Sequence, residues 1–164
     1  MSVDGTDCMI PEQTPWTKKW WSHKFNGPGV RYEIAIAIRT GLIVWINGPF
    51  PCGSYPDVNI FERDLLGMLG KYERVEADKG YSKFDPTHAK TPAFSRGKKQ
   101  EEIQNRVRAR QETINKRLKQ WGVLKHRFRN HLDHHHLVFG AVAIITQLSI
   151  LSGEPLFHIP DYVD

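Results

Sequence analysis

The sequence has little cysteine, and this scarcity limits the kinds of site that the chain can build. Its 164 residues include two cysteines, Cys8 and Cys52. Two thiols cannot form a framework of several disulfides or supply the four ligands of a structural zinc site. We therefore expect a reducing compartment and a fold that depends on its hydrophobic core.

Long hydrophobic runs are also scarce. The longest is Leu137–Leu151. It is interrupted by Thr146, Gln147 and Ser149 and is shorter than the roughly 20 apolar residues that cross a bilayer as a helix. It is better interpreted as a buried helix. No charged segment followed by an apolar one opens the chain, so the sequence indicates no targeting signal. We expect one soluble globular domain over residues 1–164, with no membrane partner.

Acidic residues are fewer than basic ones. Lys and Arg number 23 against 18 Asp and Glu, which gives a formal net charge of +5 at pH 7. Most of the excess positive charge lies in residues 96–129. Such a stretch is typical of a solvated helix face and equally of a surface that follows nucleic acid phosphates. The charge balance favours a polyanionic partner without requiring one.

Alternation of apolar and polar residues predicts strands in the first half of the chain. In Arg31–Ile38, Tyr32 and three isoleucines fall on one face of an extended chain. Thr40 and Gly41 turn the chain into a second strand, which predicts an antiparallel hairpin. The prolines and glycines of residues 48–57 predict a loop. The expected elements are strands near the start and at 31–38, 42–50 and 73–77, and helices after Asp57, at 101–124 and at 134–151.

Residues 101–124 carry the strongest helical pattern. At about 100° per residue, five apolar residues fall within one narrow sector: Ile103, Val107, Ile114, Leu118 and Trp121. The opposite face carries Arg108, Glu112, Lys116 and Lys119. Taken alone, this face is best explained as solvent-exposed ion pairs around Glu112. The order strand, hairpin, helix, strand, loop, helix, helix predicts an α/β fold with a mixed sheet.

Three carboxylates fall on three separate elements. Asp4 lies in the first strand, Asp78 at the end of strand 73–77, and Glu112 on the long helix. Metal-assisted phosphodiester hydrolysis needs hard oxygen ligands that gather two divalent ions about 3.5–4 Å apart. Three acidic side chains can supply such ligands, although their spacing alone does not show that they converge. Asp57 is explained as the cap of the helix that follows it.

Four segments carry a resemblance to a known family. In chain order they are SVDGTDCMI, IVWINGPFPCGSYPD, VEADKGY and RARQETINKRLKQWGVLKHRFRN. Together they resemble the catalytic core of the DDE superfamily endonucleases, the transposase-derived family that includes PIF/Harbinger-type elements. The resemblance covers nearly the whole chain. It implies a ribonuclease H-like α/β fold, in which a mixed sheet carries helices on its faces.

The resemblance also implies a site and its chemistry. Asp4 of DGT, Asp78 of DKGY and Glu112 of RQETIN take the places of the catalytic carboxylates and metal ligands. The implied cofactor is Mg²⁺ or Mn²⁺, with Asp4 between two ions. The implied reaction is hydrolysis of a DNA phosphodiester bond that leaves a 3′ hydroxyl. Asp57 in GSYPD also matches a family position. Nearby basic residues are candidates for contacts to DNA phosphates: Lys79, Arg108, Arg110, Lys116 and Lys119.

The family pattern extends further at the N-terminus than this chain does. Members carry a longer N-terminal region, commonly with a helix-turn-helix DNA reader, whereas only three residues precede Asp4. We therefore expect a truncated N-terminus and a separate DNA-targeting protein as a partner. Two functions stay open: a DDE-type nuclease, and an inactive DNA-binding or protein-interaction module that keeps the fold. The expected location is the nucleus if the source is eukaryotic and the cytoplasm otherwise, and oligomer formation stays open.

Overall fold

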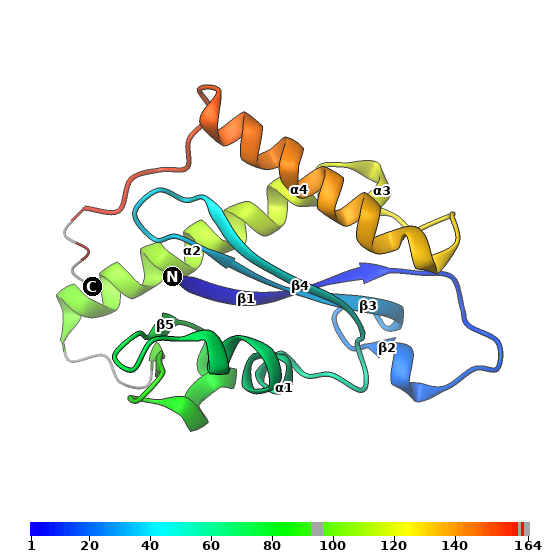
Figure 1. The fold of residues 1–164 in the computed structure, drawn as a ribbon, viewed down its shortest axis with the longest axis horizontal. Helices are drawn as coiled ribbons and strands as arrows, with labels where there is room; N and C mark the ends of the chain where they lie inside the picture. The colour runs from blue at the N-terminus through cyan, green and yellow to red at the C-terminus, as the bar shows by residue number, and fades with distance from the viewer. Residues whose placement is uncertain (93–96, 161, 163–164) are drawn as a thin grey trace.

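A mixed sheet runs through the centre of the molecule (Figure 1). The computed structural model describes residues 1–92, 97–160 and 162, so Arg96 at the start of the basic stretch lies outside the described residues. Within the described part, the sheet has six strands: β1 Ser2–Met9, β2 Trp21–Ser22, β3 Gly27–Ile36, β4 Ile43–Pro51, β5 Val75–Glu76 and β6 Ala89–Lys90. Their order is β2-β3-β1-β5-β6, and β4 pairs with β3.

The sheet combines antiparallel and parallel pairs. β1 pairs along its whole length with β3, and β3 pairs with β4 as the predicted hairpin; both pairs are antiparallel. β5 is parallel to β1, with Ser2 opposite Glu76, and β6 is parallel to β5. The prediction of an α/β fold with a mixed sheet is confirmed.

Helices cover both faces of the sheet. They are α1 Asp57–Ile60, which continues as a π-helix Phe61–Leu65 and a 3-10 turn Leu66–Met68, then α2 Lys98–Leu118, α3 Gly122–Lys125 and α4 His135–Leu151. In Figure 1, α4 lies above the central strands and the α1 segment below them. Because successive strand residues point to opposite faces, Ile34 of β3 packs against the α2 and α4 side and Ala35 against the α1 side.

The larger core lies between the sheet, α2 and α4. Its centre is a stack of aromatic rings from β3 and α4, in which the Tyr32 and Phe139 centroids are 3.7 Å apart and the planes nearly parallel. The Tyr32 hydroxyl also lies 2.8 Å from Nδ1 of His135 at the start of α4. These contacts attach α4 to the sheet through one face of the helix.

The smaller core lies on the other face of the sheet. Val3 of β1 and Val75 of β5 pack against the Phe61 and Leu65 side chains of the π-helix. Tyr81, which is in the 3-10 helix Lys79–Phe84, closes this core and contacts the Phe61 ring edge-on at 5.5 Å. The chain segments on either side of Asp78 are therefore held by buried apolar contacts.

Most expected elements are confirmed, and the differences fall at turns and ends. β3 starts at Gly27, earlier than predicted, and β4 continues to Pro51, inside the predicted loop 48–57. Gly48 has a φ of +139°, which glycine adopts without a Cβ clash, so the strand bends there and its pairing continues. β2 and β6 are two residues long, and no alternating pattern predicts strands so short.

The helices differ from the predictions in two respects. Val107, Ile114 and Leu118 are buried, but α2 ends at Leu118, so the predicted helix is too long and Trp121 is 43% exposed outside it. In α4 one face is buried and the other is exposed, so the prediction of a buried helix is correct for one face alone.

We predict that Phe139→Ala lowers the free energy of unfolding by about 3–5 kcal/mol, because it removes a fully buried ring and leaves a cavity beside Tyr32. Urea denaturation measures this loss. The matched control is Phe157→Ala, at an exposed phenylalanine, where we expect a loss below about 1 kcal/mol. Equal losses in the two variants would contradict the position of Phe139 in the core.

Candidate functional site

One pocket is lined by all three carboxylates singled out in the sequence. β1 contributes Asp4, the end of β5 contributes Asp78, and α2 contributes Glu112. The rest of the lining comes from the same three elements: Ser2, Val3, Glu76, Ala77, Arg108 and Gln111. Three acidic residues that are far apart in the sequence therefore meet at one place on the sheet.

Strand pairing explains why Asp4 and Asp78 meet. Ser2 of β1 lies opposite Glu76 of β5 in a parallel pair. Asp4 and Asp78 each follow this pair by two residues. Because side chains two residues apart share a face of a strand, the pairing directs both carboxylates to the same side.

Hydrogen bonds hold α2 across the start of β1. The Ser2 hydroxyl donates to Oε1 of Gln111 at 2.8 Å, and Nε2 of Gln111 donates to the carbonyl of Ile34 at 3.1 Å. One turn later, Nδ2 of Asn115 donates to Oδ2 of Asp4 at 2.8 Å. Glu112 lies between these two amide residues and is exposed at the mouth of the pocket.

Asp4 is the least exposed of the three carboxylates. Its second oxygen, Oδ1, accepts a hydrogen bond of 2.8 Å from the Gly5 amide. The pKa of Asp4 is raised from 3.8 to about 6, chiefly by burial and in smaller part by the charges of Asp57 and Asp78, while Lys24 and the Gly5 amide act to lower it. Asp4 is thus a largely buried carboxylate whose negative charge a bound cation would offset.

Asp78 is held by a local turn. It caps the 3-10 helix Lys79–Phe84, with Oδ1 accepting a hydrogen bond of 2.7 Å from the Gly80 amide. The side chain is exposed. Its backbone is fixed by β5 on one side and by the buried Tyr81 on the other, so a rigid frame presents an accessible carboxylate.

Asp57 does not line the carboxylate pocket but lies against Gly5 of β1, and its predicted role as a helix cap is wrong. The N-cap of α1 is Pro56, and the Asp57 side chain makes no capping hydrogen bond. Instead its Oδ1 lies 3.0 Å from Nε of Arg31. A Cβ atom at Gly5 would lie 2.0 Å from the same oxygen, which explains why a glycine follows Asp4.

Arg31 connects Asp57 to the sheet. It donates two hydrogen bonds to Asp7 on β1, at 2.7 and 3.0 Å, and one to the carbonyl of Tyr55 at 3.0 Å. Burial opposes ionisation of Asp7, but the bonds from Arg31 and Ser22 outweigh it and hold the pKa of Asp7 below its ordinary value. The Arg31–Asp7 pair therefore holds the segment of Tyr55 and Asp57 against β1.

The five basic candidates are placed differently. Arg108 lines the carboxylate pocket, Lys79 and Lys116 are exposed, and Lys119 is half-buried. Arg110 is a correction, because it is buried and its guanidinium donates to the carbonyl of Ile38. Burial also lowers the pKa of Arg110. Its charge supports the turn after β3 and does not face solvent.

The donor set fits a divalent cation by its chemistry. Carboxylate oxygens are the hard ligands that Mg²⁺ and Mn²⁺ prefer. Over residues 1–92, 97–160 and 162, no three His, Cys, Asp or Glu side chains are grouped closely enough to hold one ion. Asp78 and Glu112 are exposed, so their side chains have room to turn toward Asp4.

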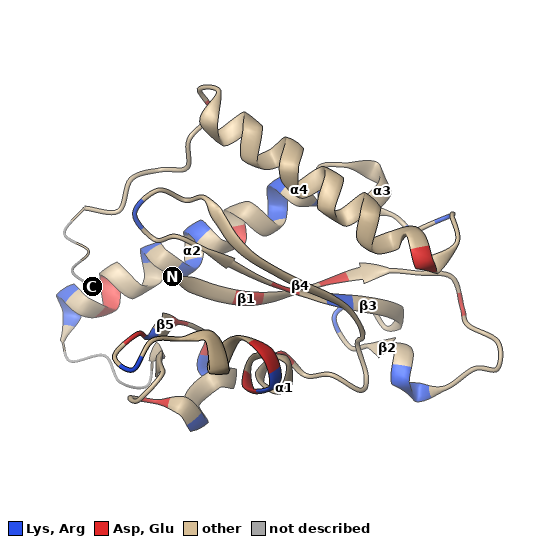
Figure 2. Ribbon diagram, viewed as in Figure 1, with Lys and Arg blue, Asp and Glu red and all other residues tan. Residues whose placement is uncertain are grey.

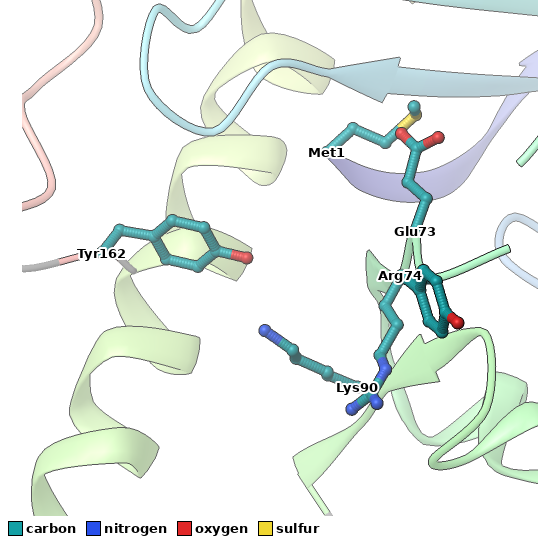
Figure 3. Close-up of a pocket in the computed structure, with 6 residues that line it drawn as sticks. Met1, Glu73, Arg74, Lys90 and Tyr162 are labelled. Atoms are coloured by element: carbon teal, nitrogen blue, oxygen red, sulfur yellow. The ribbon is translucent and has the colours of Figure 1, made fainter. Parts of the chain in front are cut away.

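A second cavity adjoins the carboxylate pocket through Glu76. It is lined by Met1, Tyr72, Glu73, Arg74, Lys90 and Tyr162. Figure 3 shows Lys90 extending across it toward Tyr162, whose hydroxyl donates to Oε1 of Glu76 at 3.3 Å. Nζ of Lys90 lies 3.8 Å from the same oxygen. Basic and aromatic side chains thus lie next to the carboxylate pocket, on the side of Glu76.

Comparisons of the chain with protein-family models, curated proteins and solved structures each gave no match. Membership of the DDE family therefore stays a prediction from the motifs.

The raised pKa of Asp4 has a consequence for stability. An acid with a higher pKa in the folded chain binds its proton more tightly when folded. Its stabilising contribution is present below 3.8 and is lost as the pH rises through about 6. We predict that Asp4→Asn, without divalent metal, raises the free energy of unfolding at pH 7 by about 1–3 kcal/mol.

This gain should disappear near pH 3.8, where Asp4 of the wild type is protonated in the folded chain. Urea denaturation at both pH values measures it. Asp133→Asn, at an exposed carboxylate, is the control and should change stability little at either pH. A destabilised Asp4→Asn protein at pH 7 would contradict the burial that disfavours the ionised form of Asp4.

Proposed function

We propose that the chain is a metal-dependent DNA endonuclease of the DDE transposase type with a ribonuclease H-like fold. The observation that carries the proposal is that Asp4, Asp78 and Glu112, which match the three family motifs in order, line one pocket. The mixed sheet with helices on both faces agrees with the fold that the resemblance implies.

The three carboxylates of Asp4, Asp78 and Glu112 would hold Mg²⁺ or Mn²⁺. When bound, the ions supply an activated water and stabilise the leaving oxygen. Asn115 and the Gly5 amide orient the Asp4 carboxylate through one hydrogen bond to each oxygen. Asp78 is oriented by the Gly80 amide. Asp4 is therefore held in place, whereas the exposed Asp78 and Glu112 would turn toward it when the ions bind.

The proposed reaction adds water across one phosphodiester bond of DNA. The water oxygen bonds to phosphorus, the bond from phosphorus to O3′ breaks, and the departing oxygen takes a proton to become the 3′ hydroxyl. Arg108, inside the pocket and one helical turn before Glu112, is placed to balance the charge of a bound phosphate. Arg108 is therefore the basic residue closest to the proposed chemistry.

DNA is the proposed substrate because basic residues lie in the pocket and beside it. Lys and Arg recur along α2 in Figure 2. Lys79 follows Asp78 directly, and Arg74 and Lys90 line the adjoining cavity. Phosphate contacts of this kind position a duplex without reading its sequence. We therefore expect the nuclease to show little preference for DNA sequence on its own.

The second candidate is a non-catalytic DNA-binding or interaction module with the same fold. One observation favours it: in the described part of the chain, no three potential ligands are grouped closely enough to hold an ion. The three carboxylates that line one pocket argue against it, because a surface that binds a polyanion gains nothing from negative charge.

We predict that the purified chain nicks supercoiled plasmid DNA in the presence of Mg²⁺ or Mn²⁺ and that a chelator stops the reaction. Glu112→Gln should lower the nicking rate by at least about 100-fold, because it removes a charged metal ligand at nearly constant shape. Glu102→Gln is the matched control. Glu102 is exposed on the same helix and pairs with Arg106 at 3.1 Å, so its loss should leave the rate nearly unchanged.

Gel electrophoresis of the plasmid forms distinguishes the two candidates. Nicking that depends on metal and on Glu112 supports the nuclease. DNA binding that weakens with salt, without nicking in either metal, would contradict it and support the module.

A further inference from the structure

One face of α4 is apolar and exposed. Leu137, Ile144 and Leu151 are 61%, 63% and 63% exposed, and Leu148 and Ile145 are about half exposed. Ala141 is exposed between them. In Figure 1, α4 forms the upper boundary of the molecule, and no described element lies beyond it. Large aliphatic side chains in such number on one helix are unusual for a surface that contacts only water.

The exposed residues follow a heptad spacing. Positions 137, 141, 144, 148 and 151 are separated by four, three, four and three residues. This alternation places them in one seam along the helix, as the core positions of a coiled coil are placed. Leucine or isoleucine occupies every position but 141. Two helices that each carry such a seam can pack their aliphatic side chains against each other.

The seam carries no charge that would select a different partner. Residues 135–151 contain no Lys, Arg, Asp or Glu; the red band where this helix starts in Figure 2 is Asp133, in the 3-10 turn Leu132–His134 directly before α4. The opposite face of α4 is occupied by the core, where Phe139 stacks on Tyr32 and His135 contacts the Tyr32 hydroxyl. The helix is therefore held in place with its seam outward.

We propose that α4 packs against α4 of a second copy of this chain, forming a symmetric dimer. A twofold interface needs a surface that is complementary to itself, and an uncharged aliphatic seam meets this condition. The exposed large residues of this face are the four of the seam and Ile145 beside it. Each leaves on the order of 100 Å² accessible to solvent, or roughly 1,000 Å² in total for two copies. This reaches the lower size of a specific interface, about 1,000–1,200 Å².

A lipid surface fits these observations less well. Residues 132–151 are long and apolar enough to cross a membrane, but a third of that segment is buried in the fold. Leaving the core would expose Phe139 and break its stack on Tyr32. Helices that lie on membranes usually carry Lys and Arg beside their apolar face, and α4 has none. The second copy is the occupant that the seam favours.

The test uses Ile144→Cys in the full chain. Ile144 is the middle residue of the seam, so two copies bring the new thiols together, and a mild oxidant should link them into a disulfide dimer. Cys8 and Cys52 are free but buried and should stay unreacted. Met68→Cys, at a residue 69% exposed and far from α4 in the sequence, is the control and should stay monomeric on a denaturing gel.

Sedimentation equilibrium measures the same contact without a crosslink. The wild type should approach twice the 19.0 kDa of one chain as its concentration rises. Ile144→Glu should weaken association by at least about 100-fold, because the change acts on both copies, while Met68→Glu should not. Circular dichroism checks that both variants are folded.

Three results would overturn the proposal. They are a wild type that stays monomeric at all concentrations, a dimer that Ile144→Glu leaves intact, and a monomer that binds phosphatidylcholine–phosphatidylserine vesicles through α4.

Discussion

Ser2 connects three elements that the sequence places far apart. Its backbone pairs with β3 on one side and with Glu76 of β5 on the other, and its hydroxyl donates to Gln111 of α2. Gln111 in turn donates to the carbonyl of Ile34, so the helix, the central strand and the parallel strand share one set of hydrogen bonds. Asp4, Asp78 and Glu112 lie one or two residues from these contacts. The positions of all three carboxylates therefore depend on this junction.

Several carboxylates near the junction are disfavoured in their ionised form. Asp4, Asp57 and Asp78 influence one another, and burial raises the pKa of Glu33 on the neighbouring strand to about 7. Lys24 and Arg31 offset part of this negative charge. Arg31 is fully engaged in the fold through Asp7 and Tyr55. A region in which burial and neighbouring charges disfavour ionised carboxylates is one where a divalent cation would gain most by binding.

The sequence predicted the strands and helices that have long, regular patterns. Alternation identified β3 and β4, and the apolar sector identified α2, because these elements bury one face over several turns or residues. Shorter features depend on distant contacts. β2 and β6 exist only because neighbouring strands pair with them, and the bend at Gly48 that continues β4 depends on the close approach of Arg31.

The motifs proposed the candidate site, and the spacing of its residues alone would not have proposed it. Nothing in the number of residues between Asp4 and Asp78 shows that β1 and β5 are parallel neighbours. Asp57 was assigned to a helix cap because local rules favour it, whereas a tertiary contact with Arg31 decides its position. A tertiary contact also decides the position of Arg110. As a charged residue on a basic helix it was predicted to contact DNA or solvent, but it is buried and donates to the carbonyl of Ile38 in the turn after β3.

Calorimetric titration of Mn²⁺ into the purified chain, beside Asp78→Asn, tests the shared metal site without requiring a DNA sequence. Asparagine keeps the acceptor that caps the 3-10 helix, so the variant should fold normally. We predict that the wild type binds Mn²⁺ and that Asp78→Asn loses this binding, while Asp133→Asn keeps it. A wild type that binds no Mn²⁺, or an Asp78→Asn protein that binds it equally well, would contradict the convergence of the three carboxylates on one metal site.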